Sequence, residues 1–102
     1  MIDKEKILAL AAEELADANT KHPPKFRSMH EAYAVIKEEL EELKEDVDLF
    51  ERYFESMWHD VRDDCNEAAG CELEKMYKYA VNAVQEGIQV IAMCDKALRS
   101  IE

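Results

Sequence analysis

The stretch from Met29 to Val61, MHEAYAVIKEELEELKEDVDLFERYFESMWHDV, decides the fold. Neither glycine nor proline interrupts it, and apolar side chains return every three or four residues, which is the period of an amphipathic helix. Ser28 and Glu31 have the spacing of a capping box, which fixes where the helix starts. The sequence therefore predicts one long helix over 29–61. Its apolar stripe comprises Ile36, Leu40, Leu43, Val47, Phe50, Phe54, Trp58 and Val61.

The length of this helix has a consequence for assembly. At 1.5 Å per residue it would be about 50 Å long, whereas a compact chain of this size has a radius of gyration of ~13 Å. Either the helix bends or breaks, near 45–48, or it projects beyond the monomer and pairs with another subunit. We expect oligomerisation together with a bend.

The rest of the chain also reads as helical. A helix over 3–19 with Asp3 as its N-cap and a helix over 72–100 are expected, separated from 29–61 by a loop at 20–27 and a polar connection at 63–71. The predicted fold class is all-α, an antiparallel helical bundle in a single domain over 1–102. The helix over 72–100 is apolar on two opposite sides, which favours a subunit interface and hence a homodimer or homotetramer.

Charge and composition exclude several partners. The net charge of −11 opposes binding to a nucleic acid polymer or to an anionic membrane. No apolar run approaches the ~18 residues of a membrane span. Three cysteines without a signal peptide argue against a disulfide framework, and we expect a cytoplasmic protein. A zinc site built from His59, Cys65 and Cys71 matches no standard ligand spacing.

Acidic residues gather on one flank of the helix over 29–61. Glu39, Glu42 and Asp46 fall along this flank at helical spacing, and Glu38 lies a little further round. An acidic helix face is commonly no more than a solvated surface, so this run does not define a site by itself.

A further acidic residue, Glu86, lies on an otherwise apolar face of the helix expected over 72–100. An ionised carboxylate there needs a partner, which is either a lysine or arginine or a bound cation. If Glu39, Glu42 and Glu86 converge, each pair ~5 Å apart repels by about 3 kcal/mol at an effective dielectric constant of 20. A divalent ion offsets this repulsion, and oxygen ligands favour Mg²⁺, with Mn²⁺ as the alternative.

These residues resemble a known family. The segment 38–42 reads as EExxE, the segment 86–93 (EGIQVIAM) resembles a later helix, and together with the His22-Pro23-Pro24 turn they are similar to the MazG-like nucleotide pyrophosphohydrolases, especially small phage and prophage members. The resemblance implies an all-α fold assembled as dimers or tetramers. It also implies hydrolysis of nucleoside triphosphates to monophosphate and pyrophosphate with Mg²⁺.

The resemblance also implies the metal ligands, which map onto Glu39, Glu42, Glu86 and Gln89. Gln89 departs from the family pattern, in which an aspartate stands at the matching position, so the site has one formal charge fewer. The segment 50–70 lengthens the separation between Glu42 and Glu86 and is interpreted as an insertion, an extra helix used in assembly or as a lid.

The remaining site residues are expected from chemistry. Glu38 is the candidate base that orients the attacking water. Lys21, Lys25 and Arg27 form a stretch free of acids and are candidates for binding the phosphates, with a solvated loop as the alternative. The aromatic residues Tyr33, Phe26 and Trp58 suit either base stacking or, more often, a core position.

Two functions are compatible with these features. The first is a metal-dependent nucleoside triphosphate pyrophosphohydrolase that removes unwanted nucleotides or adjusts their pool. The second is a non-catalytic helical oligomer that binds nucleotide or a protein partner, which the neutral Gln89 favours. Asp95, on an apolar face, is expected to form a buried hydrogen bond or an interfacial salt bridge, with a role in the site as the alternative.

Overall fold

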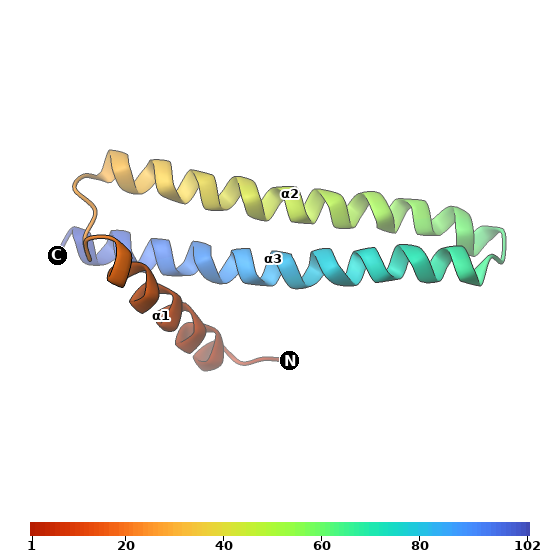
Figure 1. Cartoon of the computed structure of the whole chain (residues 1–102), viewed down its shortest axis with the longest axis horizontal. Coiled ribbons are helices and arrows are strands. Elements are labelled where there is room, and N and C mark those ends of the chain that lie inside the picture. The colour runs from red at the N-terminus through yellow and green to blue at the C-terminus, as the bar shows by residue number, and fades with distance from the viewer. The chain divides into compact units, whose positions relative to one another are not determined.

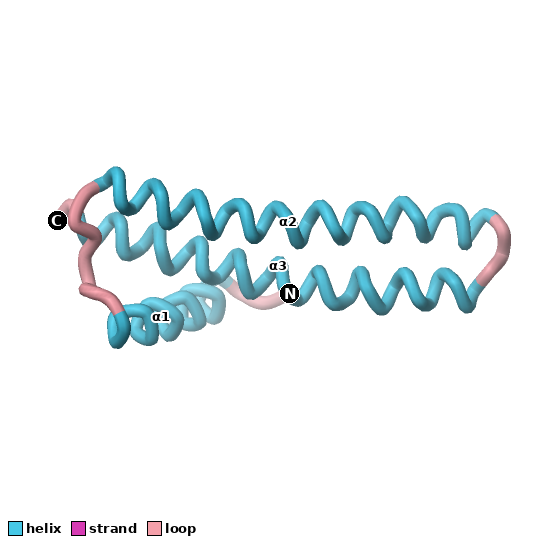
Figure 2. Tube along the Cα trace, turned by 45° about the horizontal axis from the view of Figure 1, so that its top comes forward, coloured by secondary structure: helices cyan, strands magenta, loops and turns pink.

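The computed structural model describes residues 1–102 as three α-helices without strands (Figures 1 and 2). Helix α1 spans Lys4–Lys21, α2 spans Met29–Arg62 and α3 spans Asn66–Ser100. Short connections join them (Figure 2). The helices pack against each other, so the predicted all-α helical fold is confirmed.

The chain divides into two compact units. The first contains Met1–Glu41 and Gln85–Glu102, and the second contains Glu42–Val84. Both α2 and α3 cross from one unit to the other as continuous helices. The first unit therefore holds α1, the start of α2 and the end of α3, and the second holds the remaining halves of the two long helices.

Three alanines, one leucine and one phenylalanine form the buried helix contacts of the first unit. Ala11 and Leu15 of α1, Ala32 of α2 and Ala92 of α3 are all buried, and Phe26 from the connection joins them. Alanine at a contact lets two helix backbones approach closely, which leaves room beside them for longer side chains. Figure 1 shows α1 beside the C-terminal end of α3 in this unit.

The second unit is a helical hairpin closed by a tight turn. Cys65 N donates to the Asp60 carbonyl at 2.8 Å and Asp64 N donates to the Val61 carbonyl at 3.1 Å. Asp64 adopts a positive φ of 53°, so these two hydrogen bonds form a Schellman motif that ends α2. Further along the hairpin the Tyr53 and Tyr79 rings stack with centroids 5.8 Å apart.

Two sequence predictions about element bounds were wrong. Helix α3 begins at Asn66 rather than at 72, because the turn at Asp63–Cys65 suffices to reverse the chain and Gly70 is accommodated within the helix. Helix α2 is uninterrupted, so the break considered near 45–48 is absent. The segment 50–70 is consequently no separate helix, since it consists of the end of α2, the turn and the start of α3.

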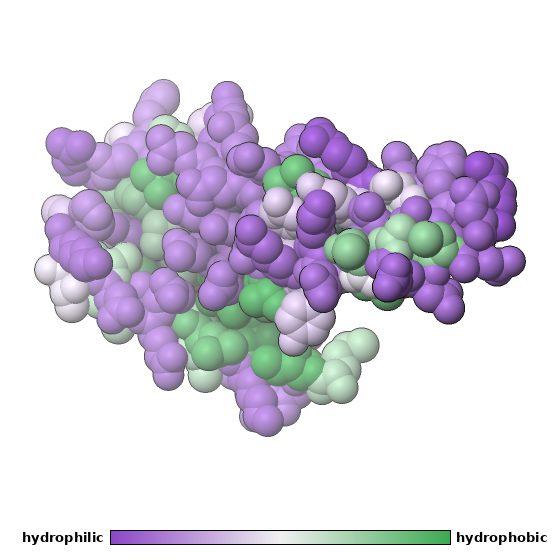
Figure 3. Space-filling view, turned by 45° about the vertical axis from the view of Figure 1, so that its right-hand side comes forward, coloured by the Kyte–Doolittle hydropathy of each residue, from purple (hydrophilic) through white to green (hydrophobic).

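Large apolar side chains remain exposed in both units. Figure 3 shows apolar residues in green between hydrophilic residues in purple on the face that it presents. On α3, Tyr77 is 76 % exposed and Val84 64 %, and on α2 Trp58 is 59 % exposed. The two apolar sides of α3 expected from the sequence are thus not both covered within the chain. None of the three helices combines the length and the apolar character needed to cross a membrane.

Candidate metal centre and adjoining pocket

The start of α2 sets the register of the acidic residues that follow. Ser28 Oγ accepts from Glu31 N at 3.1 Å, as the capping box predicts. The Glu31 carboxylate, however, accepts from the backbone N–H of Arg27 at 3.1 Å instead of that of Ser28. It also accepts from Arg27 Nε at 2.8 Å and lies 2.6 Å from Arg27 Nη2. The backbone and side-chain hydrogen bonds from Arg27 lower the pKa of Glu31 from its ordinary value of 4.5.

Two turns further along α2, the predicted acidic cluster is present. Carboxylate oxygens of Glu39, Glu42 and Glu86 all lie within 4.8 Å of one another. Glu39 and Glu86 are half-buried, and one oxygen of each is inaccessible to solvent, whereas Glu42 is exposed. Glu42 follows Glu39 by three residues and so lies on the same side of α2. The donor set consists of carboxylate oxygens alone, which suits a hard divalent ion such as Mg²⁺ or Mn²⁺.

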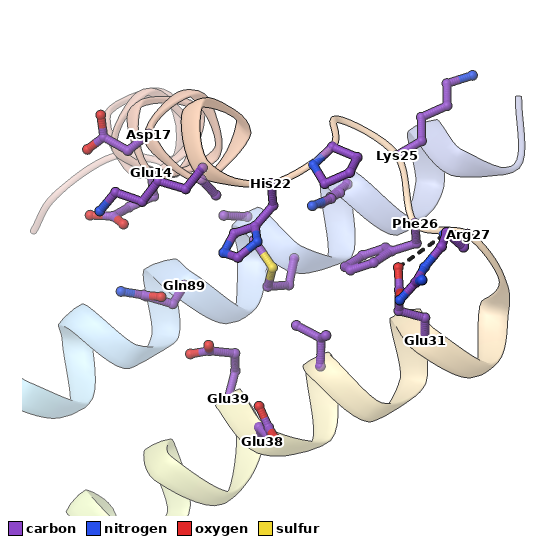
Figure 4. A pocket seen from close by; sticks show the side chains of 17 residues that line it. Glu14, Asp17, His22, Lys25, Phe26, Arg27, Glu31, Glu38, Glu39 and Gln89 are labelled. Carbon is purple, nitrogen blue, oxygen red and sulfur yellow. Dashed lines mark hydrogen bonds and ion pairs between the residues drawn. The ribbon is translucent and has the colours of Figure 1, made fainter.

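A pocket of about 830 Å³ lies in the first unit and shares Glu39 with this cluster. All three helices and the connection between α1 and α2 contribute to it (Figure 4). Its volume lies within the range of about 300–1,000 Å³ that is typical of small-molecule sites. The polar residues around it are Glu14, Asp17, Lys21, His22, Lys25, Arg27, Glu31, Glu38, Glu39, Gln89 and Lys96.

The residues predicted as metal ligands and base divide between the cluster and the pocket. Glu39 belongs to both. Glu38 is exposed and Gln89 is half-buried, and both line the pocket. Figure 4 shows Glu38 and Glu39 rising from α2 opposite Gln89 on α3. Gln89 follows Glu86 by three residues on α3, so its amide oxygen is available one turn from the carboxylates.

The three predicted phosphate-binding residues all line the pocket, but in different ways. Arg27 already forms the ion pair with Glu31. The Lys25 side chain points away from the other labelled residues in Figure 4. Lys21, the last residue of α1, is exposed. A phosphate group near Arg27 would therefore compete with Glu31 for its guanidinium group.

Sequence reasoning missed Lys96. This residue of α3 is 5 % exposed and lines the pocket, and its ammonium lies 4.6 Å from the centre of the Phe26 ring. Ser100 Oγ accepts from Phe26 N at 2.8 Å and donates to the Lys96 carbonyl at 2.7 Å, which fastens the connection to the end of α3. Helical periodicity contains the signal that was overlooked, since Gln89, Met93 and Lys96 follow one another on one face of α3.

Other sequence predictions can also be compared with the structure. Asp95 accepts from Arg99 Nε at 3.2 Å in an exposed ion pair between neighbouring turns of α3, so the expected buried hydrogen bond is absent. Phe26 is buried as a core residue, whereas Tyr33 is 71 % exposed and Trp58 is also largely exposed, so the core interpretation was wrong for these two. The thiols of Cys65, Cys71 and Cys94 are free.

Comparison with known proteins adds nothing to these observations, because no protein-family profile, curated protein or solved structure matches the chain.

Proposed function

We propose that the chain is a metal-dependent nucleoside triphosphate pyrophosphohydrolase, which converts a nucleoside triphosphate to the monophosphate and pyrophosphate. The observation that carries the proposal is the proximity of Glu39, Glu42 and Glu86, whose carboxylate oxygens lie within 4.8 Å of one another. Residues far apart in the sequence would thus supply one compact set of hard oxygen ligands to an ion bound there. The MazG-like resemblance implies these three residues together with Gln89 as metal ligands.

The chemistry of the donors fits Mg²⁺ or Mn²⁺. Glu39, Glu42 and Glu86 would hold the ion, and the amide oxygen of Gln89 would add a weaker neutral ligand. Bound there, the ion would screen phosphate charge and lower the pKa of a bound water. Glu38, exposed at the rim of the pocket, would orient the attacking water and accept its proton. Lys21 would attract the phosphate chain.

A pyrophosphate-release assay tests this function. The full chain is incubated with a panel of nucleoside triphosphates and Mg²⁺ or Mn²⁺, and Glu39→Gln is compared with Glu41→Gln. Both variants lose one charge from α2, but Glu41 is exposed and belongs neither to the cluster nor to the pocket. We expect Glu39→Gln to reduce kcat/KM by roughly 100-fold, a loss of about 2.7 kcal/mol. Glu41→Gln should leave it unchanged. Turnover that survives Glu39→Gln would remove α2 from the mechanism.

A second candidate function is a non-catalytic helical oligomer that binds nucleotide or a protein partner. The neutral Gln89 and the exposed apolar residues of α3, such as Tyr77 and Val84, favour it. A rise in melting temperature with Mg²⁺ and a non-hydrolysable triphosphate, without pyrophosphate release from any substrate, would select this function. Gln89→Asp separates the two further, since it restores a fourth carboxylate. In an inactive protein it should create turnover, and in an active one it should raise metal affinity.

A further inference from the structure

Lys96 is the one buried charged residue of the chain, and the mechanism above does not use it. It is 5 % exposed and borders the pocket from α3. Lysine is seldom buried to this extent without a compensating partner, because transfer of an ammonium group out of water is unfavourable. The surroundings of Lys96 therefore bear on what the pocket binds.

The contacts of Lys96 leave its charge available to a ligand. Its ammonium lies 4.6 Å from the centre of the Phe26 ring, and this cation–π contact offsets part of the lost hydration. Glu31 on α2 interacts electrostatically with Lys96, but both of its carboxylate oxygens accept hydrogen bonds from Arg27. Arg27 thus neutralises the acid that would otherwise pair with Lys96.

Charge is separated along the pocket. Gln89 and Lys96 are seven residues apart on α3, which corresponds to about 10 Å at 1.5 Å per residue. On α2, Glu31 and Glu39 are eight residues apart, or about 12 Å. Glu39, the residue that the cluster shares with the pocket, and Gln89 are therefore about two helical turns away from Glu31 and Lys96. A ligand that reaches both ends must carry negative charge along a chain rather than at one point.

We propose that Lys96 is the anion-binding residue of the pocket and binds the distal phosphates of a polyphosphate chain whose other end lies at Glu39. The orientation of the chain rests on the proposed function, because it needs a divalent ion at the carboxylate end. A lysine suits this role since its ammonium is a point charge that phosphate oxygens approach from several directions. A monocarboxylate or a single phosphate would reach only one end.

Inorganic tripolyphosphate is the probe that tests the role of Lys96. Isothermal titration of the full chain in the presence of Mn²⁺ compares wild type with Lys96→Met and Lys37→Met. Methionine keeps most of the length of lysine and its packing on Phe26, and Lys37 is an exposed residue of α2 outside the pocket. We expect Lys96→Met to weaken tripolyphosphate binding at least tenfold and Lys37→Met to leave it within twofold. Equal affinities of the two variants would overturn the inference, as would wild type that does not bind.

Two further measurements keep the test decisive. If Lys96→Met does not fold, the Lys96 Cε resonance of ¹³C-labelled wild type is followed instead. It should shift on addition of tripolyphosphate and saturate at the calorimetric Kd, whereas a resonance that does not move overturns the inference. In wild type, orthophosphate should bind at least tenfold more weakly than tripolyphosphate, and equal affinities count against a chain-shaped ligand.

The outcomes for Lys96 and for hydrolysis are distinguishable. Mn²⁺ affinity in the absence of phosphate should be the same in Lys96→Met and wild type, because the cluster is intact. If the protein turns over triphosphates and Lys96→Met does not change the KM, the inference about Lys96 is wrong, whereas the proposed hydrolase activity is supported. If tripolyphosphate binding depends on Lys96 but no nucleotide is turned over, the proposed hydrolase activity is wrong and the inference about Lys96 is supported.

Discussion

Neutralising Glu86 should reverse the order of stability of two proteins when a metal ion is added. Glu86 takes part in two of the three carboxylate pairs, and the oxygens concerned are no farther apart than 4.8 Å. At that distance two unit charges repel by about 0.9 kcal/mol at a dielectric constant of 80 and about 3.5 kcal/mol at 20. Glu42 is exposed, so solvent screening reduces the summed repulsion between Glu86 and the other two carboxylates. We therefore expect Glu86→Gln to stabilise the metal-free protein by about 1 kcal/mol.

The metal-bound proteins should behave in the opposite way. A ligand at a concentration of 100 Kd stabilises the folded state by about 2.7 kcal/mol. Wild type should gain this stabilisation with Mn²⁺, whereas Glu86→Gln lacks a charged ligand and should gain much less. Since 1 kcal/mol corresponds to roughly 4–8 °C in a domain of this size, the variant melts several degrees higher with chelator and several degrees lower with Mn²⁺.

Circular dichroism melts of wild type, Glu86→Gln and Glu41→Gln, each with EDTA and with Mn²⁺, provide the assay. Glu41→Gln removes an exposed charge from α2 outside the cluster and should respond to Mn²⁺ as wild type does. The reasoning is refuted if Glu86→Gln gains as much from Mn²⁺ as wild type. In that case the three carboxylates do not bind the ion, however close their oxygens lie.

Three other predictions concern the framework around the site. Asp64→Gly should raise the free energy of unfolding by about 0.5–1 kcal/mol, because glycine adopts the positive φ at the end of α2 without steric cost, and urea denaturation measures it. Ser100→Ala should lower it by about 1–2 kcal/mol, because Phe26 N loses its acceptor, and amide exchange at Phe26 should accelerate. The lowered pKa of Glu31 contributes stability that is present above pH 4.5 and lost as pH falls through the folded pKa. Glu31→Gln should therefore reduce the dependence of the melting temperature on pH in that acidic range. A profile of melting temperature against pH that is the same in variant and wild type would contradict the role of Arg27.

The sequence predicted the features that depend on short-range periodicity. The rhythm from Ile36 to Val61 identified α2, and Ser28 gave its first turn correctly. The same periodicity placed Glu39 and Glu42 on one flank, and the apolar neighbours of Glu86 directed attention to α3. The argument that a carboxylate on an apolar face needs a partner left open whether that partner is a lysine or arginine or a cation shared with Glu39 and Glu42. Only the family resemblance implied that the three carboxylates form one site.

Features that depend on packing between segments were not predictable in this way. The start of α3 was missed because the turn needs only Asp63–Cys65, with a positive φ at Asp64, and the polar residues after it already belong to the helix. Lys96 was overlooked because its burial results from Phe26, which reaches α3 from a connection far away in the sequence. Periodicity places Lys96 on the same face of α3 as Gln89 and Met93, but neither periodicity nor composition records its contact with Phe26.

The two ends of the pocket should act jointly on a polyphosphate. The chain carries a net charge of −11, and Glu14, Asp17, Glu38 and Glu39 add local repulsion around the pocket. Lys96 alone does not outweigh these acids, so a polyphosphate needs the divalent ion at the cluster as well. Binding free energies are reciprocal, and the factor by which Mn²⁺ tightens tripolyphosphate binding must therefore equal the factor by which tripolyphosphate tightens Mn²⁺ binding. If titrations in the two orders both give a factor near one, the cluster and the pocket are independent sites, and the polyphosphate chain does not connect them.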